Sequence, residues 1–246
     1  MSFRHAHHFR RESIINQART AGILPCMPLQ RIDMHCHTNA SGDCSMQPAR
    51  LLAVARDRGL QRLCITDHNS VRAGLELAAR APELVVPGIE LLTTRGELLA
   101  YFVTAEVPAR LKPLRAIELL RAQGAVISVS HPFDHKRGAR WSAADLAQIL
   151  PHVDALETFN ARCVTRGMNP LATLAAFDAG LPATAGSDAH SYGEVGIAGL
   201  LLPDFSNAHE LCAALRSAQI FGQRSSVAVH LSSSWAALRS RAGGKL

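Results

Sequence analysis

The chain has 246 residues, 48% of them apolar, and carries 26 Lys and Arg against 20 Asp and Glu, a net charge of +6 with neutral histidines. This length suits one large domain or two small ones, and a single α/β barrel uses about as many residues. The sequence contains no apolar stretch of the ~18–20 residues that a membrane span needs. The positive charge suits an anionic ligand and is equally compatible with nucleic acid, but an aromatic content of 5% argues against stacking platforms for single strands.

Composition also divides the chain into three segments. Residues 1–30 contain four arginines and one acid, which we interpret as a flexible leader, although an organelle transit segment has a weakly similar composition. Residues 31–225 are predicted to form one domain, because no linker, repeat or low-complexity block divides them, and residues 226–246 are predicted to form a C-terminal tail. The six cysteines form no Cys-x-x-Cys pair, and their irregular spacing predicts reduced thiols in a cytoplasmic protein.

From residue 31 onward, strand-like apolar runs alternate with helical stretches. The predicted strands are 31–36, 61–66, 84–89, 97–103, 125–130, 153–159, 182–186 and 197–202. The predicted helices are 48–59, 71–80, 109–123, 142–150, 167–179 and 206–217. Pro48 suits the first turn of a helix, and Gly180 suits a helix end. Strands that alternate with helices predict a mostly parallel sheet with helices outside.

Metal-ligand residue types gather where these strand-like runs end. His35 and His37 alternate at the end of the first run, so both imidazoles can point to one side of the strand. Further acids, amides and imidazoles follow later runs: Asp67, His68, Glu90, His131, Glu157, Asn160, Asp188 and His190. In a parallel α/β barrel such positions converge on the C-terminal face, where active sites lie.

This mixture of imidazoles and carboxylates without cysteine suits Zn, Mn or Fe. The candidates are too many for one ion, but two or three ions bridged by a carboxylate such as Glu90 would use them. Metals about 3.5–4 Å apart polarise a phosphoryl oxygen and turn bound water into hydroxide, so the leading predicted reaction is phosphoester hydrolysis. Arg162 is the first candidate for holding the phosphate, followed by Arg137, with Lys136 and Arg140 nearby.

Several motifs together resemble the PHP (polymerase and histidinol phosphatase) family. They are Asp33-Met-His-Cys-His-Thr38, Ile65-Thr-Asp-His-Asn69, Gly88-Ile-Glu90, Val129-Ser-His-Pro132 and Gly186-Ser-Asp-Ala-His190, in family order. Glu157-Thr-Phe-Asn-Ala-Arg162 is similar to the family's Glu-x-x-Asn segment. The resemblance covers about residues 31–202 and implies a single-domain α/β fold, a distorted (βα)7 TIM-like barrel with a trinuclear metal site.

The resemblance also implies which residues would hold each metal. One ion would take His35, His37, Glu90 and Asp188; a second would share Glu90 and take His131; a third would take Asp43, His68 and His190. The implied catalytic residues are His35, His37, Glu90, Asp188 and His190. Glu97 departs from the family pattern, because many members carry a histidine at its place in the fourth strand. A glutamate can still ligate a metal and favours a harder ion such as Mn or Fe.

Some roles stay open in the sequence. Asp33 and Asp67 are expected to support ligands or strand ends instead of binding metal. Glu157 could bind metal or support a basic group such as Arg162. The leaving alcohol would be protonated by His190, by His68 or by a metal-bound water. Because ligand histidines must be deprotonated, activity is expected to fall below about pH 6.

Three functions fit these observations. The first is a metal-dependent phosphoesterase acting on a small phosphomonoester or a nucleotide through a metal-activated hydroxide. The second is a nuclease acting on oligonucleotides, and the third is a non-catalytic regulator that binds metal or phosphate. Amide-ring hydrolysis usually needs a metal-bridging lysine after a strand, and none of the three lysines has that place. Substrate specificity is expected to lie in loops 104–112, 133–142 and 160–168.

Overall fold

The protein is described by a computed structural model, in which residues 28–137, 140–163 and 165–225 are placed. The predicted C-terminal tail and all but the last three residues of the predicted leader lie outside the described residues. The five cysteines that are described are free thiols. No helix in the described ranges is long and apolar enough to cross a membrane.

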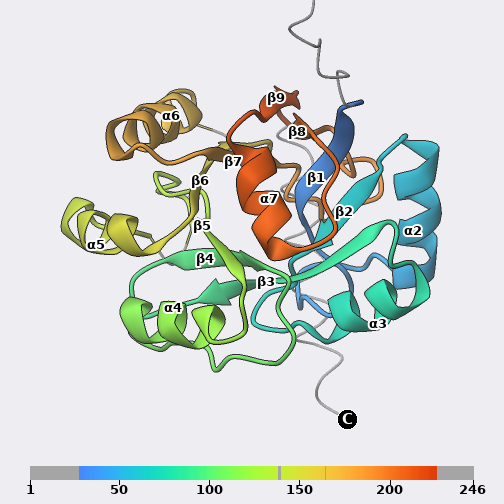
Figure 1. Cartoon of the computed structure of the whole chain (residues 1–246), viewed down its shortest axis with the longest axis horizontal. Helices are drawn as coiled ribbons and strands as arrows, with labels where there is room; N and C mark the ends of the chain where they lie inside the picture. Colours follow the sequence, from blue (N-terminus) through green and yellow to red (C-terminus); the bar gives the residue numbers. More distant parts are fainter. Residues whose placement is uncertain (1–27, 138–139, 164, 226–246) are drawn as a thin grey trace, which may run out of the picture.

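Within these ranges, nine strands form one sheet in the order β7-β6-β5-β4-β3-β2-β1-β8-β9 (Figure 1). The strands are β1 (Gln30–Cys36), β2 (Arg62–Ile65), β3 (Val85–Leu92), β4 (Glu97–Tyr101), β5 (Val126–Val129), β6 (Ala155–Asn160), β7 (Ala183–Gly186), β8 (Ala198–Leu202) and β9 (Gln219–Gly222). All eight predicted strands are present, and β9 is an additional one. The pairs β1–β2, β2–β3, β5–β6 and β6–β7 are parallel, as strand–helix alternation predicts.

The sheet closes on itself where β7 returns to β1. The backbone amide of Asp188 donates a hydrogen bond to the carbonyl oxygen of His35 over 2.8 Å. A Cβ atom on Gly186 would lie 2.3 Å from the Cβ of His35, so this close approach requires glycine. The buried carboxylate of Asp33 accepts hydrogen bonds from the amides of Ser187 and Gly196, both at 2.9 Å. Strands β1–β7 therefore form a distorted barrel, and Asp33 supports its closure instead of touching a ligand imidazole.

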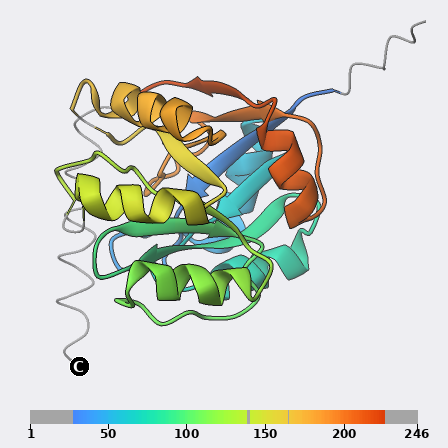
Figure 2. The ribbon, with the colours of Figure 1, turned by 60° about the vertical axis from the view of Figure 1, so that its left-hand side comes forward.

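Helices cover the outside of this barrel, as predicted. They are α2 (Pro48–Asp57), α3 (Arg72–Arg80), α4 (Pro113–Arg121), α5 (Ala143–Ile149), α6 (Met168–Ala179) and α7 (Ala208–Leu215), with a 3-10 turn at Leu150–His152. Figure 2 shows α4, α5 and α6 stacked along one side of the barrel. Pro48 begins α2, and Gly180, with a φ of 65°, ends α6.

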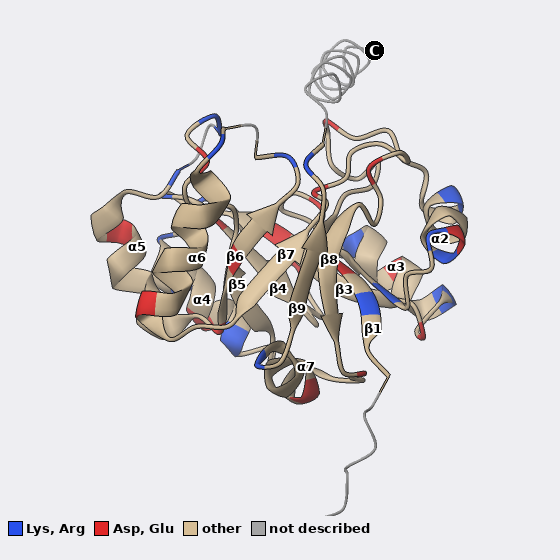
Figure 3. Ribbon diagram, turned by 90° about the horizontal axis from the view of Figure 1, so that it is seen from above, with Lys and Arg blue, Asp and Glu red and all other residues tan. Residues whose placement is uncertain are grey.

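Helix α7 lies across the end of the barrel where β1 begins (Figures 1 and 3). Its buried residues Leu211 and Leu215 pack into the same hydrophobic cluster as Ile32, Met34 and Tyr101 of the barrel strands. This packing fills one end of the barrel with apolar side chains. The opposite end carries the loops that follow β1, β2 and β3, and it is left for polar chemistry.

Strand β4 runs against the alternating pattern. It pairs with β3 and β5 in antiparallel register, for example Leu92 with Glu97 and Leu98 with Val129. A short turn connects β3 to β4 without a helix. The first residue of β4 therefore lies at the end of the barrel where the parallel strands finish, and this places Glu97 among the residues that follow the other strands.

Candidate metal centre

The centre is built around His35 and His37 at the end of β1. Both residues have no exposed surface, and their Nε2 atoms lie 3.1 Å apart. The Nδ1 atom of His35 lies 2.8 Å from Glu157 Oε1, and that of His37 lies 3.0 Å from Ser41 Oγ. Each ring is thus held through Nδ1, which leaves Nε2 for a ligand.

The bonds around Ser41 define which nitrogen of His37 carries a proton. The Ser41 hydroxyl donates to Asp67 Oδ1 over 2.7 Å, so its oxygen accepts the hydrogen bond from His37 Nδ1. Asp67 also accepts from the amide and hydroxyl of Thr38, at 2.6 and 2.7 Å. His37 Nε2 is consequently an unprotonated lone pair, and Asp67 supports this tautomer from one step away.

Two carboxylate oxygens lie close to the Nε2 atoms of these rings, at distances that suit ligands of a small metal ion. Glu90 Oε2 lies 3.3 Å from His35 Nε2 and 3.4 Å from His37 Nε2. Asp188 Oδ1 lies 3.7 and 3.2 Å from the same two nitrogens. Ligands at about 2.1 Å from a tetrahedral zinc-sized ion stand roughly 3.4 Å apart. His35, His37 and Glu90 therefore fit one first-row divalent metal, and Asp188 Oδ1 approaches both of its imidazole nitrogens.

Two of these atoms, Glu90 Oε2 and Asp188 Oδ1, are buried carboxylate oxygens that accept no hydrogen bond of normal geometry among the described residues. An uncompensated carboxylate oxygen in the interior is costly. A bound cation would satisfy both oxygens at once, so the donor set itself fits a metal.

Glu90 also connects this group to its neighbours. Its Oε1 atom lies 2.9 Å from His131 Nε2 and accepts a hydrogen bond from Ser130 Oγ over 2.7 Å. Its Oε2 atom lies 2.9 Å from His68 Nδ1. A carboxylate with different imidazoles at its two oxygens has the geometry of a bridging ligand.

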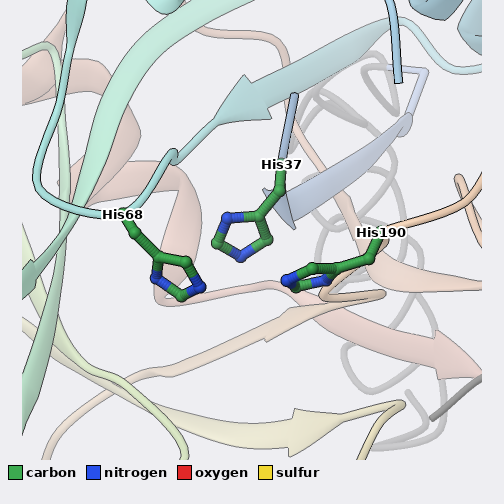
Figure 4. Close-up of side chains that lie close together, drawn as sticks. All are labelled: His37, His68 and His190. Carbon is green, nitrogen blue, oxygen red and sulfur yellow. The ribbon is translucent and has the colours of Figure 1, made fainter. Parts of the chain in front are cut away.

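A second group of ligand atoms lies towards the solvent. His190 Nε2 and His68 Nε2 lie 3.2 and 3.6 Å from Asp43 Oδ2. Figure 4 shows the rings of His37, His68 and His190 turned towards one another, and one ligand atom from each falls within 4.8 Å of the others. Asp43, His68 and His190, which the family resemblance implies for one ion, thus lie close together.

A third group contains Glu97, whose Oε2 lies 3.5 Å from His131 Nε2. Glu97 also shares a ligand-like cluster with His68 and Glu90. The indole of Trp141 donates to the Glu97 carbonyl over 3.3 Å and occupies the space beside Gly96 that a Cβ atom would need. Glu97 is therefore fixed in the position that the family resemblance reserves for a histidine ligand.

Two of the candidate ligands have unusual backbone conformations. Asp188 has a φ of 54° and His131 a φ of 22°. Few residues other than glycine adopt this region, and those that do cluster at functional sites where the surrounding structure compensates the strain. Each residue lies two positions after the end of a strand, and the turn of the backbone directs its side chain into the centre.

The charges of the centre depend on one another. Burial alone would lower the pKa of His35, but the carboxylates of Glu90, Asp188 and Glu157 raise it well above the ordinary value. Burial would raise the pKa of Glu90, yet His35 and His68 hold it well below its usual range. Burial, together with His190 and His68, keeps the pKa of His37 low, so that ring is neutral. The centre therefore combines ionised carboxylates with imidazoles that are either neutral or can release a proton to a metal. Such a set is suited to binding a divalent cation.

The two candidate phosphate-binding arginines differ in place. The Arg137 guanidinium contacts the Asp188 carboxylate and lies 3.1 Å from Asp134 Oδ2, and about a fifth of its side chain is exposed. Arg162 is buried, with Nη1 3.8 Å from Glu194 Oε1. Glu194 in turn accepts from the His190 amide over 3.2 Å. Arg137 thus touches a candidate ligand, and Arg162 contacts Glu194, which also binds the His190 amide.

Several supporting residues were not assigned a role from the sequence. Ser41 orients His37, Asp134 holds Arg137, and Glu194 holds the His190 loop. Asp134 and Arg137 are three residues apart, a spacing that could have suggested an ion pair. Glu194 accepts hydrogen bonds from the His190 amide and the Ser191 hydroxyl, three to four residues before it, whereas its contact with Arg162 joins distant parts of the chain.

Comparisons of the sequence find a matching family profile and two similar proteins. A sequence profile described as PHP-associated matches residues 167–220. Two uncharacterized proteins of Methanocaldococcus jannaschii are 33% identical over 147 residues and 34% identical over 169 residues. These matches cover 53% of this chain and 82% of the first protein, and 68% of this chain and 68% of the second.

Solved structures with the same fold are more distant in sequence. A candidate metal-dependent phosphoesterase from Bifidobacterium adolescentis aligns with a TM-score of 0.55 at 17% identity, over 68% of this chain and 90% of that one. A two-domain Bacteroides vulgatus protein containing a predicted PHP-like metal-dependent phosphoesterase gives 0.62 at 17%, over 80% and 66%. An amidohydrolase from Chromobacterium violaceum, with bound sulfate and no metal, gives 0.56 at 16%, over 68% and 90%.

The solved structures share the distorted barrel of this chain, at whose C-terminal face the metal-ligand residue types gather. The chain belongs to the PHP family, as its motifs indicated.

Proposed function

We propose that this protein is a metal-dependent phosphoric ester hydrolase that acts on a small phosphomonoester or nucleotide. The observation that carries the proposal is a pair of buried imidazole nitrogens, His35 Nε2 and His37 Nε2, that lie 3.1 Å from each other and 3.2–3.7 Å from the carboxylate oxygens of Glu90 and Asp188. Such a set is a ligand cage, and the guanidinium of Arg137 lies beside it. A cationic side chain next to a metal cage is suited to a substrate with several negative charges.

The residues that would hold two or three divalent ions fall into three groups. His35, His37, Glu90 and Asp188 would hold the first ion, Glu90, Glu97 and His131 the second, and Asp43, His68 and His190 the third. When bound, Mn, Fe or Zn ions would supply Lewis acidity and a water of lowered pKa. The carboxylate of Glu97 favours Mn or Fe in the second group.

The chain's own side chains would bind and orient the substrate. Arg137 would neutralise phosphate oxygens, since Asp188 and Asp134 hold its guanidinium at the site. Nδ1 of His190 lies 2.8 Å from the Asp188 carbonyl, which can only accept a hydrogen bond, so Nδ1 carries the ring proton. Nε2 of His190 then faces Asp43 as a lone pair, and we propose that it ligates instead of donating a proton.

The fold is also compatible with other hydrolytic reactions. The amidohydrolase from Chromobacterium violaceum shares the fold and contains bound sulfate. Lys112 and Lys136, the described lysines, both lie in loops and not at the end of a strand, which disfavours chemistry that needs a lysine between two metals.

Oligonucleotide hydrolysis is the second candidate, favoured by the net charge of +6. Phosphate contacts along a nucleic acid make binding fall steeply as salt rises. If small esters are the substrates, we expect short oligonucleotides to bind weakly and the hydrolysis of small esters to depend little on salt. A steep salt dependence of both would favour the nuclease.

The direct test is release of phosphate from an aryl phosphate and from a panel of sugar phosphates and nucleotides with added Mn. The control is the double variant His35→Ala/His37→Ala, which removes two ligands. Turnover by the wild type but not the control supports the proposal. Tight metal binding with no turnover of any ester would instead indicate a non-catalytic, metal-binding regulator.

A further inference from the structure

A cavity of about 800 Å3 adjoins the candidate metal centre on the side of Glu97. Its wall comes from the β3–β4 turn, the loop before α4 and the start of α5, and it includes Arg95, Arg110, Arg140 and Ser142. This volume lies within the range of small-molecule sites. Because Glu97 borders both the cavity and the ligand cluster, a molecule bound at the centre can extend into this space.

The charge of the cavity wall is predominantly positive. Glu97 directs its carboxylate to His131, 3.5 Å away, and Arg95 Nε lies 3.4 Å from Asp145 Oδ1. Within the described ranges, neither Arg110 nor Arg140 has a carboxylate oxygen within 4.0 Å. Among the described residues, two exposed arginines therefore line this space with no carboxylate at ion-pair distance.

A neighbouring cavity continues the same surface. It measures about 490 Å3 and shares Thr94, Arg95 and Asp145 with the first, and it adds Lys112 to the wall. Arg110, two residues before Lys112, has a φ of 62°, and its amide donates to the Leu92 carbonyl over 2.6 Å. The loop that carries both cations is thus tied to the end of β3, next to the candidate centre.

From this arrangement we infer that the cavity binds a second phosphate group, carried by the leaving-group part of the substrate. This inference rests on the proposed phosphoesterase function and narrows its substrate class to organic bisphosphates. Arginine is suited to the task, because its planar group donates two parallel hydrogen bonds to a phosphate and always keeps its charge. Arg110 and Arg140 would bind the second phosphate, while Arg95 is held by Asp145.

The inference can be tested with a pair of synthetic substrates that differ in one group. Butane-1,4-diol monophosphate ends in a hydroxyl, and butane-1,4-diol bisphosphate ends in a second phosphate. The hexane-1,6-diol pair extends the separation. We expect kcat/KM to be roughly tenfold higher for the bisphosphate, since a charge-assisted hydrogen bond contributes about that much. A twofold higher kcat/KM for the bisphosphate is expected even without a second phosphate site, because either of its ends can react.

Variants show whether the arginines cause this preference. Arg110→Gln and Arg140→Gln should each reduce the ratio of bisphosphate to monophosphate kcat/KM severalfold, and the double variant should bring it close to two. Arg115→Gln is the matched control, because Arg115 is an exposed arginine of α4 that pairs with Glu118 over 2.6 Å. This control should leave the ratio unchanged.

A binding measurement separates this inference from the proposed function. Butane-1,4-bisphosphonate cannot be hydrolysed, and calorimetry can compare its affinity with that of butylphosphonate for the Mn-loaded protein. If no ester is hydrolysed, the phosphoesterase proposal fails. The cavity assignment is still supported if the bisphosphonate binds more tightly than butylphosphonate and if Arg110→Gln weakens its binding. Equal affinities, or a ratio of two in the wild type, would overturn the cavity assignment. A larger gain for short oligonucleotides than for either bisphosphate would also overturn it.

Discussion

The inner and outer parts of the candidate metal centre differ in burial. His35, His37, Glu90 and Asp188 form the inner part, and their side chains have no exposed surface. In the outer part, His131 and His190 are almost fully buried, but the side chains of Asp43, His68 and Glu97 are 35%, 24% and 15% exposed. The inner residues come from strand ends that the barrel holds rigidly, whereas Asp43 lies in a loop. We expect the inner part to bind its ion tightly and the outer groups to exchange theirs.

The largest effect should follow from removing the residue that joins both parts. Glu90→Gln removes one charge from a side chain that approaches His35, His37, His68 and His131. We expect phosphate release to fall by more than about 100-fold, since even residues that only orient ligands contribute 10–100-fold. Metal analysis should show the loss of at least one ion per chain.

Glu83→Gln is the control for that variant, because Glu83 is an exposed acid just before β3 that pairs with Arg56 over 2.9 Å. It should leave activity and metal content unchanged. Near-normal activity of Glu90→Gln would mean that the inner and outer parts act independently and that Glu90 is not a bridge.

The inner part should also bind metal in a strongly pH-dependent way. The pKa of His35 is raised, because Glu90, Asp188 and Glu157 outweigh the effect of burial. A metal must displace the His35 proton, so apparent affinity should fall about tenfold for each pH unit below that raised pKa. Calorimetric Mn titrations from about pH 6 to 9 should show this slope together with proton release. A flat profile would contradict ligation by His35.

Removing a group that only orients the inner part should have the next largest effect. Glu157 holds His35 Nδ1 at 2.8 Å and accepts from the His131 amide over 2.7 Å. Glu157→Gln should weaken metal affinity by about 10–100-fold without removing a ligand. It should also lower the pKa of His35, which moves the pH dependence to lower pH.

Asp154→Asn is the matched control for Glu157→Gln. Asp154 lies just before β6, and its carboxylate pairs with Arg121 over 2.6 Å. The Asp154→Asn variant should leave metal affinity unchanged. If Glu157→Gln abolishes metal binding altogether, Glu157 is itself a ligand, which is the alternative that the sequence left open.

Part of the candidate metal centre could be predicted from the sequence, and part could not. Strand ends were visible as apolar runs followed by acids and imidazoles, and the parallel barrel brings His35, Glu90 and Asp188 together. The reversed direction of β4 was not visible, because an antiparallel strand has the same apolar pattern as a parallel one. The contacts of long side chains were also hidden: the Arg137 guanidinium contacts Asp188 and Arg162 approaches Glu194, and the sequence indicates neither contact.

The smallest effect is expected at the outer residue Glu97. Burial and the neighbouring Glu90 raise the pKa of its carboxyl, so its charge contributes less than that of an inner ligand. Glu97→Gln should reduce activity by about tenfold or less, an effect at the lower end of what orienting residues contribute. Glu97→His should shift the metal preference from Mn towards Zn, since imidazole is the softer ligand. Activity titrations with each metal measure both effects, and a loss as large as that of Glu90→Gln would remove the distinction between the inner and outer parts.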